Sequence, residues 1–278
     1  MAAALLVAAC ASYALLRLPA PAAPGVFSWS RAAYQADADR TLRTLQRLGA
    51  RQLYQSFDDE GLSGTAARTF SAALQENGIE LYALLDSGAW TSESLPQLEE
   101  KLRAILAFHA AGSPLRGVML DIEPYQSDAW EASAEAILQQ MQQELPEFYA
   151  KASSAGLTVY LCMPVYWADK YPDAVRDLSR FACDGVCVMN YDRVNELENM
   201  AFFVKTAKAE KKEVLCAFEF QAAGSHGLTA NQTYSGVGLA EALRGFQAIY
   251  AQYRYPKLRL AYHYLDPVEA MLDETEIS

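Results

Sequence analysis

Four carboxylates in this sequence directly follow or end short apolar runs. Asp121 and Glu123 come at the end of the run that begins at Gly117, Asp192 follows residues 184–191, and Glu219 ends residues 213–219. Carboxylates that crowd together raise one another's pKa, so one can stay protonated as an acid while another stays ionised. Hydrolysis of a glycosidic bond needs such a pair. The predicted catalytic residues are therefore Glu123, Glu219, Asp121 and Asp192.

Aromatic and polar residues occupy corresponding positions after the other apolar runs. Flat rings suit the apolar faces of sugars, and a few polar groups beside them fix the orientation of a ligand. The predicted substrate-binding residues are Tyr191, Trp29, Asp86, Tyr125, Tyr166, Trp167, His263 and Tyr264.

Eight apolar, β-rich runs alternate with longer segments whose apolar residues recur every three or four positions. This alternation predicts an α/β fold with a parallel sheet, and eight strands close such a sheet into a (β/α)₈ TIM barrel. The expected strands are 25–30, 51–57, 79–86, 116–123, 157–164, 184–191, 213–219 and 258–264. The expected helices are 36–49, 65–78, 95–111, 128–156, 173–182, 196–211 and 239–253. The candidate residues then meet at the carboxyl ends of the strands, the face that carries the active site in such barrels.

Length and composition agree with one such domain. The chain has 278 residues, of which 52% are hydrophobic, and this type of barrel takes about 250 residues. Its net charge is −11 with Lys and Arg scattered along the chain, so nucleic acid is an improbable partner. The four cysteines after Cys10 lack the spacing of a zinc site. We expect a carbohydrate substrate and neither a cofactor nor a metal.

Residues 1–23 differ from the rest of the chain. An apolar run is followed by a Pro/Ala-rich linker, and Val7-Ala8-Ala9-Cys10 resembles a bacterial lipoprotein cleavage site, although no Lys or Arg precedes it. We expect an export signal that is cleaved or lipidated at Cys10, with a short membrane anchor or an unstructured start as alternatives. The catalytic domain would then span residues 24–278, and the protein would be periplasmic, at the cell surface or secreted.

Two of the strand ends resemble a known family. Gly117-Val-Met-Leu-Asp121-Ile-Glu123 is similar to the fourth-strand motif of family 18 glycoside hydrolases (chitinases and relatives), and Met189-Asn-Tyr191-Asp192 is similar to their sixth-strand motif. The resemblance implies that Glu123 protonates the leaving oxygen. It also implies that Asp121 orients a substrate acetamido group and that Tyr191 and Asp192 support the cyclic intermediate.

The chain departs from that family in several places. Arg116 and Met119 stand where the family has earlier aspartates, and strand eight offers His263 and Tyr264 in place of a Trp. Glu219 is not part of the family pattern; it resembles the strand-seven nucleophile of the large retaining glycosidase clan, clan A. The whole chain is most similar to bacterial glycoside-hydrolase-like barrels with Asp-x-Glu-Pro-Tyr on strand four and a Glu on strand seven.

Three functions are open from the sequence. The first is hydrolysis of a poly- or oligosaccharide with Glu123 as general acid, and either a substrate acetamido group or Glu219 as nucleophile. The second is a barrel that binds glycans without turnover. The third is a metal-dependent hydrolase or lyase with Asp121, Glu123 and Asp192 as oxygen ligands.

Overall fold

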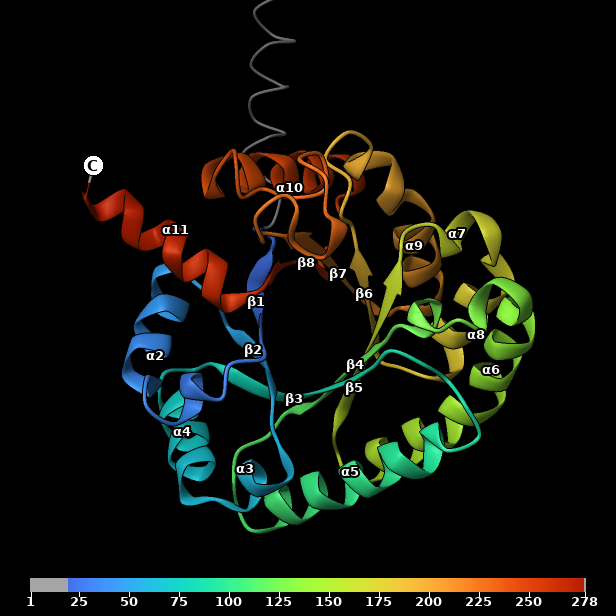
Figure 1. Cartoon of the computed structure of the whole chain (residues 1–278), viewed down its shortest axis with the longest axis horizontal. Helices are drawn as coiled ribbons and strands as arrows, with labels where there is room; N and C mark the ends of the chain where they lie inside the picture. Colours follow the sequence, from blue (N-terminus) through green and yellow to red (C-terminus); the bar gives the residue numbers. More distant parts are fainter. Residues whose placement is uncertain (1–19, 278) are drawn as a thin grey trace, which may run out of the picture.

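The protein is a closed barrel of eight parallel strands in sequence order, ringed by helices, as the computed structural model of residues 20–277 shows (Figure 1). The predicted single (β/α)₈ barrel is thereby confirmed. Residues 1–19 of the expected export segment, Cys10 among them, lie outside the described residues. The strands are β1 (Ala22–Ser28), β2 (Gln52–Ser56), β3 (Glu80–Ser87), β4 (Gly117–Ile122), β5 (Thr158–Pro164), β6 (Gly185–Met189), β7 (Glu213–Glu219) and β8 (Leu258–His263).

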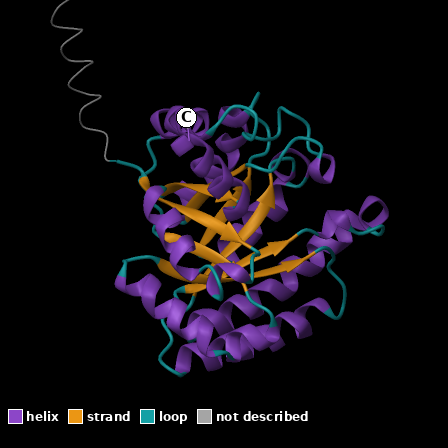
Figure 2. Cartoon of the chain, turned by 60° about the vertical axis from the view of Figure 1, so that its left-hand side comes forward, coloured by secondary structure: helices purple, strands orange, loops and turns teal. Residues whose placement is uncertain are grey.

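The helices enclose the barrel from outside (Figure 2). Those that the sequence predicts are α2 (Ala38–Arg47), α4 (Thr65–Glu76), α5 (Ser94–Ala110), α6 (Trp130–Ser154), α8 (Pro172–Phe181), α9 (Glu196–Glu210) and α10 (Leu239–Tyr253). Additional elements are η1 (Ala32–Tyr34), α3 (Asp59–Ser63), η2 (Pro124–Gln126), α7 (Trp167–Lys170), η3 (Ser225–Gly227) and α11 (Leu265–Ile277). Within residues 20–277, no helix is both long and apolar enough to cross a membrane.

Alternation along the strands separates two apolar layers. On β4, Val118, Leu120 and Ile122 pack outward in the layer between barrel and helices, whereas Met119 belongs to the cluster inside the barrel. Successive side chains of a strand point to opposite faces, so Asp121, two residues after Met119, also points inward. Parallel strands buried on both sides need apolar residues at most positions, which explains the uninterrupted runs of the sequence.

Tyrosines fill the barrel interior near the amino ends of the strands. Tyr54, Tyr82 and Tyr160 are buried there, with ring centroids 5.3 to 6.2 Å apart. The buried amide of Gln52 donates to the Tyr82 hydroxyl at 3.1 Å, and its oxygen accepts from the Tyr54 hydroxyl at 2.5 Å. These side chains separate the carboxyl end of the interior from a hollow of about 500 Å³ at the amino ends of the strands, which Gln52, Tyr82 and Tyr160 help to line.

The barrel begins earlier in the sequence than Gly25, where the first strand was expected. Ala22 pairs with Arg259 of β8, and the Arg259 guanidinium donates to the carbonyl of Ala23. The end of the Pro/Ala-rich stretch is therefore part of β1, because closing the barrel requires backbone pairing on both sides of that strand.

Candidate active site

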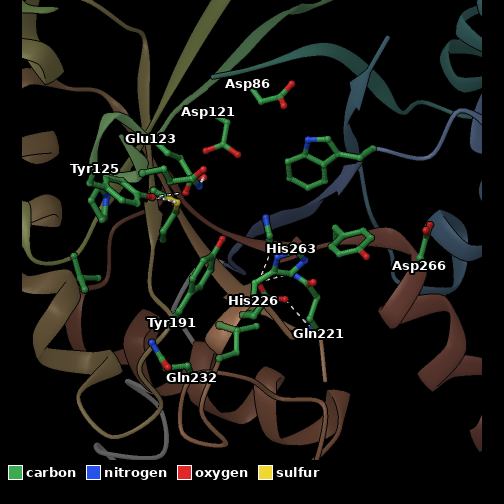
Figure 3. A pocket seen from close by; sticks show the side chains of 18 of the residues that line it. Asp86, Asp121, Glu123, Tyr125, Tyr191, Gln221, His226, Gln232, His263 and Asp266 are labelled. Atoms are coloured by element: carbon green, nitrogen blue, oxygen red, sulfur yellow. Dashed lines mark hydrogen bonds and ion pairs between the residues drawn. The ribbon is translucent and has the colours of Figure 1, made fainter. Parts of the chain in front are cut away.

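A cavity of about 830 Å³ opens at the carboxyl end of the barrel (Figure 3). Side chains from seven of the eight strand ends and from the loop after β7 surround it. The residues that line it are Trp29, Ser30, Asp86, Asp121, Glu123, Tyr125, Gln126, Pro164, Val165, Met189, Tyr191, Glu219, Gln221, His226, Leu228, Gln232, His263, Tyr264 and Asp266. Nine of the twelve predicted site residues are therefore brought together.

Glu123 is held by the short turn that follows it. Pro124 begins η2 and has no N–H to donate, so the chain turns tightly and returns the next two side chains toward Glu123. The Tyr125 hydroxyl donates to Oε1 of Glu123, and the Gln126 amide donates to its Oε2. The backbone N–H of Glu123 donates to the carbonyl of Ser87 on β3 at 2.7 Å. This half-buried carboxyl group is thus fixed in place at the cavity wall.

Asp121 lies two residues before Glu123 on the same inner face of β4. It is only 6% exposed, and its Oδ1 has no hydrogen-bond partner among the described residues. Burial, followed by the negative charge of Glu123, raises the pKa of Asp121 to about 7. Near pH 7 Asp121 is therefore only partly ionised, and burial is the larger cause, ahead of the crowding of carboxylates.

Glu219 and His263 form a second pair on the neighbouring strands β7 and β8. Oε1 of Glu219 accepts from the backbone N–H groups of Phe220 (2.8 Å) and Gln221 (2.7 Å). Its Oε2 lies 2.8 Å from Nδ1 of His263 and accepts from the Gln221 amide at 3.3 Å. Burial alone would raise the pKa of Glu219, but the His263 ring and the two N–H groups outweigh it and lower that pKa. Glu219 is thus an ionised carboxylate with both oxygens engaged.

Aromatic rings surround this second pair. The Trp29 indole lies against the rings of His263 and Tyr264, with centroids 5.0 and 5.7 Å apart, and the Tyr191 ring lies 5.3 Å from that of His263. The cavity thus combines carboxylates with partly exposed rings, and rings of this kind can stack on the apolar faces of sugars.

Three predicted site residues lie elsewhere. The Asp192 carboxylate turns into its own loop, where it accepts from the Val194 N–H (3.0 Å) and the Asn195 amide (2.8 Å). Trp167 is fully buried and stacks on Trp130 with centroids 5.9 Å apart, because α7 packs its first residue into the helix layer.

Tyr166 does not line the cavity either. Its ring lies 6.1 Å from that of Tyr125, behind the cavity wall. The sequence placed Tyr166 and Trp167 just after β5, but the turn into α7 directs both away from the mouth.

Several residues that line the cavity were not among the predicted ones. Gln221, His226, Leu228 and Gln232 come from the loop 221–238, whose length and position after β7 indicated the active-site face but not which side chains turn inward. Asp266 begins a helix that the sequence analysis did not anticipate.

The three carboxylates expected as ligands in the metal-dependent alternative do not come together. Asp192 points away from Asp121 and Glu123, and residues 20–277 contain no group of three His, Cys, Asp or Glu side chains placed to hold a metal ion.

Comparisons with known proteins find likeness in structure alone. No family model and no curated protein matches the sequence. A GH18 chitinase from Pseudoalteromonas aurantia superposes with a TM-score of 0.58 at 12% identity, covering 91% of this chain and 99% of the chitinase. The PgaB (BpsB) glycoside hydrolase domain from Bordetella bronchiseptica gives 0.54 at 12% identity, with 92% and 98% covered.

Other chemistries occur among the similar structures. A xylose isomerase domain protein from Planctomyces limnophilus gives a TM-score of 0.55 at 14% identity, with 93% of this chain and 95% of that protein covered. At such identities the likeness establishes the shared TIM barrel, and function must be argued from the site itself.

Proposed function

We propose that this protein is a glycoside hydrolase that cleaves a poly- or oligosaccharide with Glu123 as general acid. One observation carries the proposal: Glu123 is held in the wall of a large cavity lined with aromatic rings, beside the buried Asp121, whose pKa is raised to about 7. The structural likeness to glycoside hydrolases agrees with it. The export segment expected in residues 1–23 favours a glycan outside the cytoplasm as the substrate.

In the proposed reaction, Glu123 donates a proton to the glycosidic oxygen as the bond to the anomeric carbon breaks. Tyr125 and Gln126 fix the direction in which Glu123 presents that proton. Asp121, two residues before Glu123, is protonated in part near pH 7. Preorganised donors and acceptors of this kind do not have to reorient during the reaction, which lowers its barrier.

The two candidate nucleophiles differ in availability. Glu219 is 2% exposed, and both of its oxygens already accept hydrogen bonds, so it is poorly placed to attack an anomeric carbon. Asp121 and Tyr191 both line the cavity, where they could support a substrate acetamido group. We therefore favour attack by the substrate's own acetamido group, with Glu219 as the residue that positions His263.

A panel of bacterial and plant polysaccharides, chitin among them, tests the proposal through the reducing ends released. The chain from Ala20 onward should release them, whereas Glu123→Gln should reduce the rate by at least about a hundredfold, the usual contribution of a general acid. Asp192→Asn is the matched control because its carboxylate lies outside the cavity. Equal rates for the wild type and Glu123→Gln would refute the acid role. Binding without any hydrolysis would favour the glycan-binding alternative.

A further inference from the structure

The cavity is rich in carboxylates, and neither Lys nor Arg is among its described lining residues. The five carboxylates that line it are Asp86, Asp121, Glu123, Glu219 and Asp266. Glu219 is neutralised in part by His263, which lies 2.8 Å away, and His226 is the other lining residue that can carry a positive charge.

Two of these carboxylates are free to bind a ligand. Asp86 and Asp266 are exposed, and within the described part of the chain neither carboxylate takes part in a hydrogen bond or an ion pair. Arg40 is the positively charged side chain that acts on Asp266. Its guanidinium group, however, forms ion pairs with Glu269 (3.1 Å) and Asp273 (2.8 Å). The potential in the cavity is therefore negative and uncompensated.

Asp86 is the carboxylate closest to the Asp121–Glu123 pair along the sheet. It is the register partner of Asp121 on the neighbouring strand, and Figure 3 shows Asp86, Asp121 and Glu123 along one wall of the cavity. Oδ1 of Asp121 is buried and unpartnered in the same wall. A positively charged group of the substrate placed at this wall would satisfy that oxygen and relieve the repulsion among the three carboxylates.

We propose that the substrate is a partly N-acetylated glycan in which some amino groups are free, and that Asp86 binds the ammonium group of a sugar other than the one whose acetamido group attacks. This inference rests on the proposed function and adds the substrate class to it. The aromatic rings are compatible with such a ligand, because a sugar ammonium is attracted by the faces of Trp and Tyr rings as well as by carboxylates. The hydroxyl groups of a neutral glycan can also donate to these carboxylates, but only a positively charged group offsets their charge as well.

Three pentasaccharides of the same β-1,4 linkage test the inference, since they differ at C2 alone: glucosamine, N-acetylglucosamine and glucose pentamers. Calorimetry on the protein from Ala20 onward measures affinity, and mass spectrometry of the same samples detects cleavage. We expect the glucosamine pentamer to bind at least tenfold more tightly than the other two at low salt. The difference should shrink as salt is added, because ion pairs at an open cavity are screened.

Matched variants separate recognition at Asp86 from attraction by the net charge. Asp86→Asn should remove most of the preference, whereas Asp128→Asn, which deletes the same charge outside the cavity, should leave it unchanged. Pentalysine, a cation without sugar rings, should bind more weakly than the glucosamine pentamer. Equal or weaker binding of the glucosamine pentamer, or an unaltered preference in Asp86→Asn, would overturn the inference. Cleavage of the N-acetylglucosamine pentamer, which alone of the three carries the acetamido group, supports the proposed function whichever pentamer binds best, so the two ideas can fail separately.

Discussion

Asp121→Asn should make the protein more stable in alkaline but not in acidic solution. The ordinary pKa of Asp is 3.8, and burial together with the charge of Glu123 raises the pKa of Asp121 to about 7 in the folded protein. Folding therefore favours the protonated form. Below pH 4 Asp121 is neutral in both the folded and the unfolded state and does not lower the free energy of unfolding. Between pH 4 and 7 that free energy falls by about 1.4 kcal/mol per pH unit. Above pH 7 the loss is constant at about 4 kcal/mol.

Asparagine has nearly the shape of a protonated aspartate and carries no charge at any pH. Chemical unfolding of Asp121→Asn and wild type at pH 4.5, 6 and 8 should show free energies of unfolding that differ by only about 1 kcal/mol at pH 4.5. They should differ by about 4 kcal/mol at pH 8 in favour of the variant, by the same linkage. Asp86→Asn is the matched control: it removes an exposed carboxylate from the adjacent strand, where burial cannot impose this cost.

A second background tests the cause of the effect. Because the charge of Glu123 contributes to the raised pKa of Asp121, the gain from Asp121→Asn at pH 8 should be smaller in a Glu123→Gln protein. The explanation would be wrong if Asp121→Asn gave the same stability difference at pH 4.5 and pH 8, or if it destabilised the protein at pH 8.

Three further outcomes are expected. The rate kcat/KM on any substrate found should fall as pH rises through about 7, because Asp121 then loses its proton, and a pH–rate profile without that alkaline limb would show that the reaction does not need protonated Asp121. Glu219→Gln should change the tautomer of His263 seen by nitrogen NMR and lower activity, while Glu219→Asp should restore part of both; an unchanged tautomer would refute the positioning role. Gly117→Ala should lower the free energy of unfolding, measured with denaturant, by at least about 3 kcal/mol, because the added methyl group would overlap the backbone of β5. A loss under about 1 kcal/mol would show that the strands can separate at that point.

The barrel could be predicted because its strands are buried on both faces. Each strand is then an unbroken apolar run, and the predicted bounds of seven strands lie within two residues of the observed ones. Three glycines also helped to predict where helices end. Gly49, Gly78 and Gly156 have φ values of 63°, 66° and 82°, the left-handed conformation that ends a helix. The start of β1 was misplaced because Ala and Pro carry little strand signal, and barrel closure decides that pairing.

The site could be predicted as far as the strands determine which way a side chain points. Asp121, Glu219 and His263 end strands or lie within them, so the two-residue alternation places them inside the barrel. Asp192, Tyr166 and Trp167 come after their strands, where the path of the connecting loop sets the direction, and a pattern of residue types does not encode that path. The same reason explains why Gln232 and the other cavity residues of the loop after β7 escaped prediction.

The two pairs of the cavity differ in how they are stabilised. Glu219 accepts four hydrogen bonds, one of them shared with His263, so its charge is well solvated by the protein and its place is fixed. Asp121 has a buried oxygen without a partner and a neighbouring negative charge, so its ionised form is unfavourable until a ligand arrives. A protein gains no stability from such an arrangement, because the hydrogen bond with the Cys162 thiol leaves Oδ1 of this buried carboxyl group without a partner among the described residues. Its presence next to an open cavity is therefore best explained by what binds there: a group that takes a proton from the pair, or one whose positive charge the pair can neutralise.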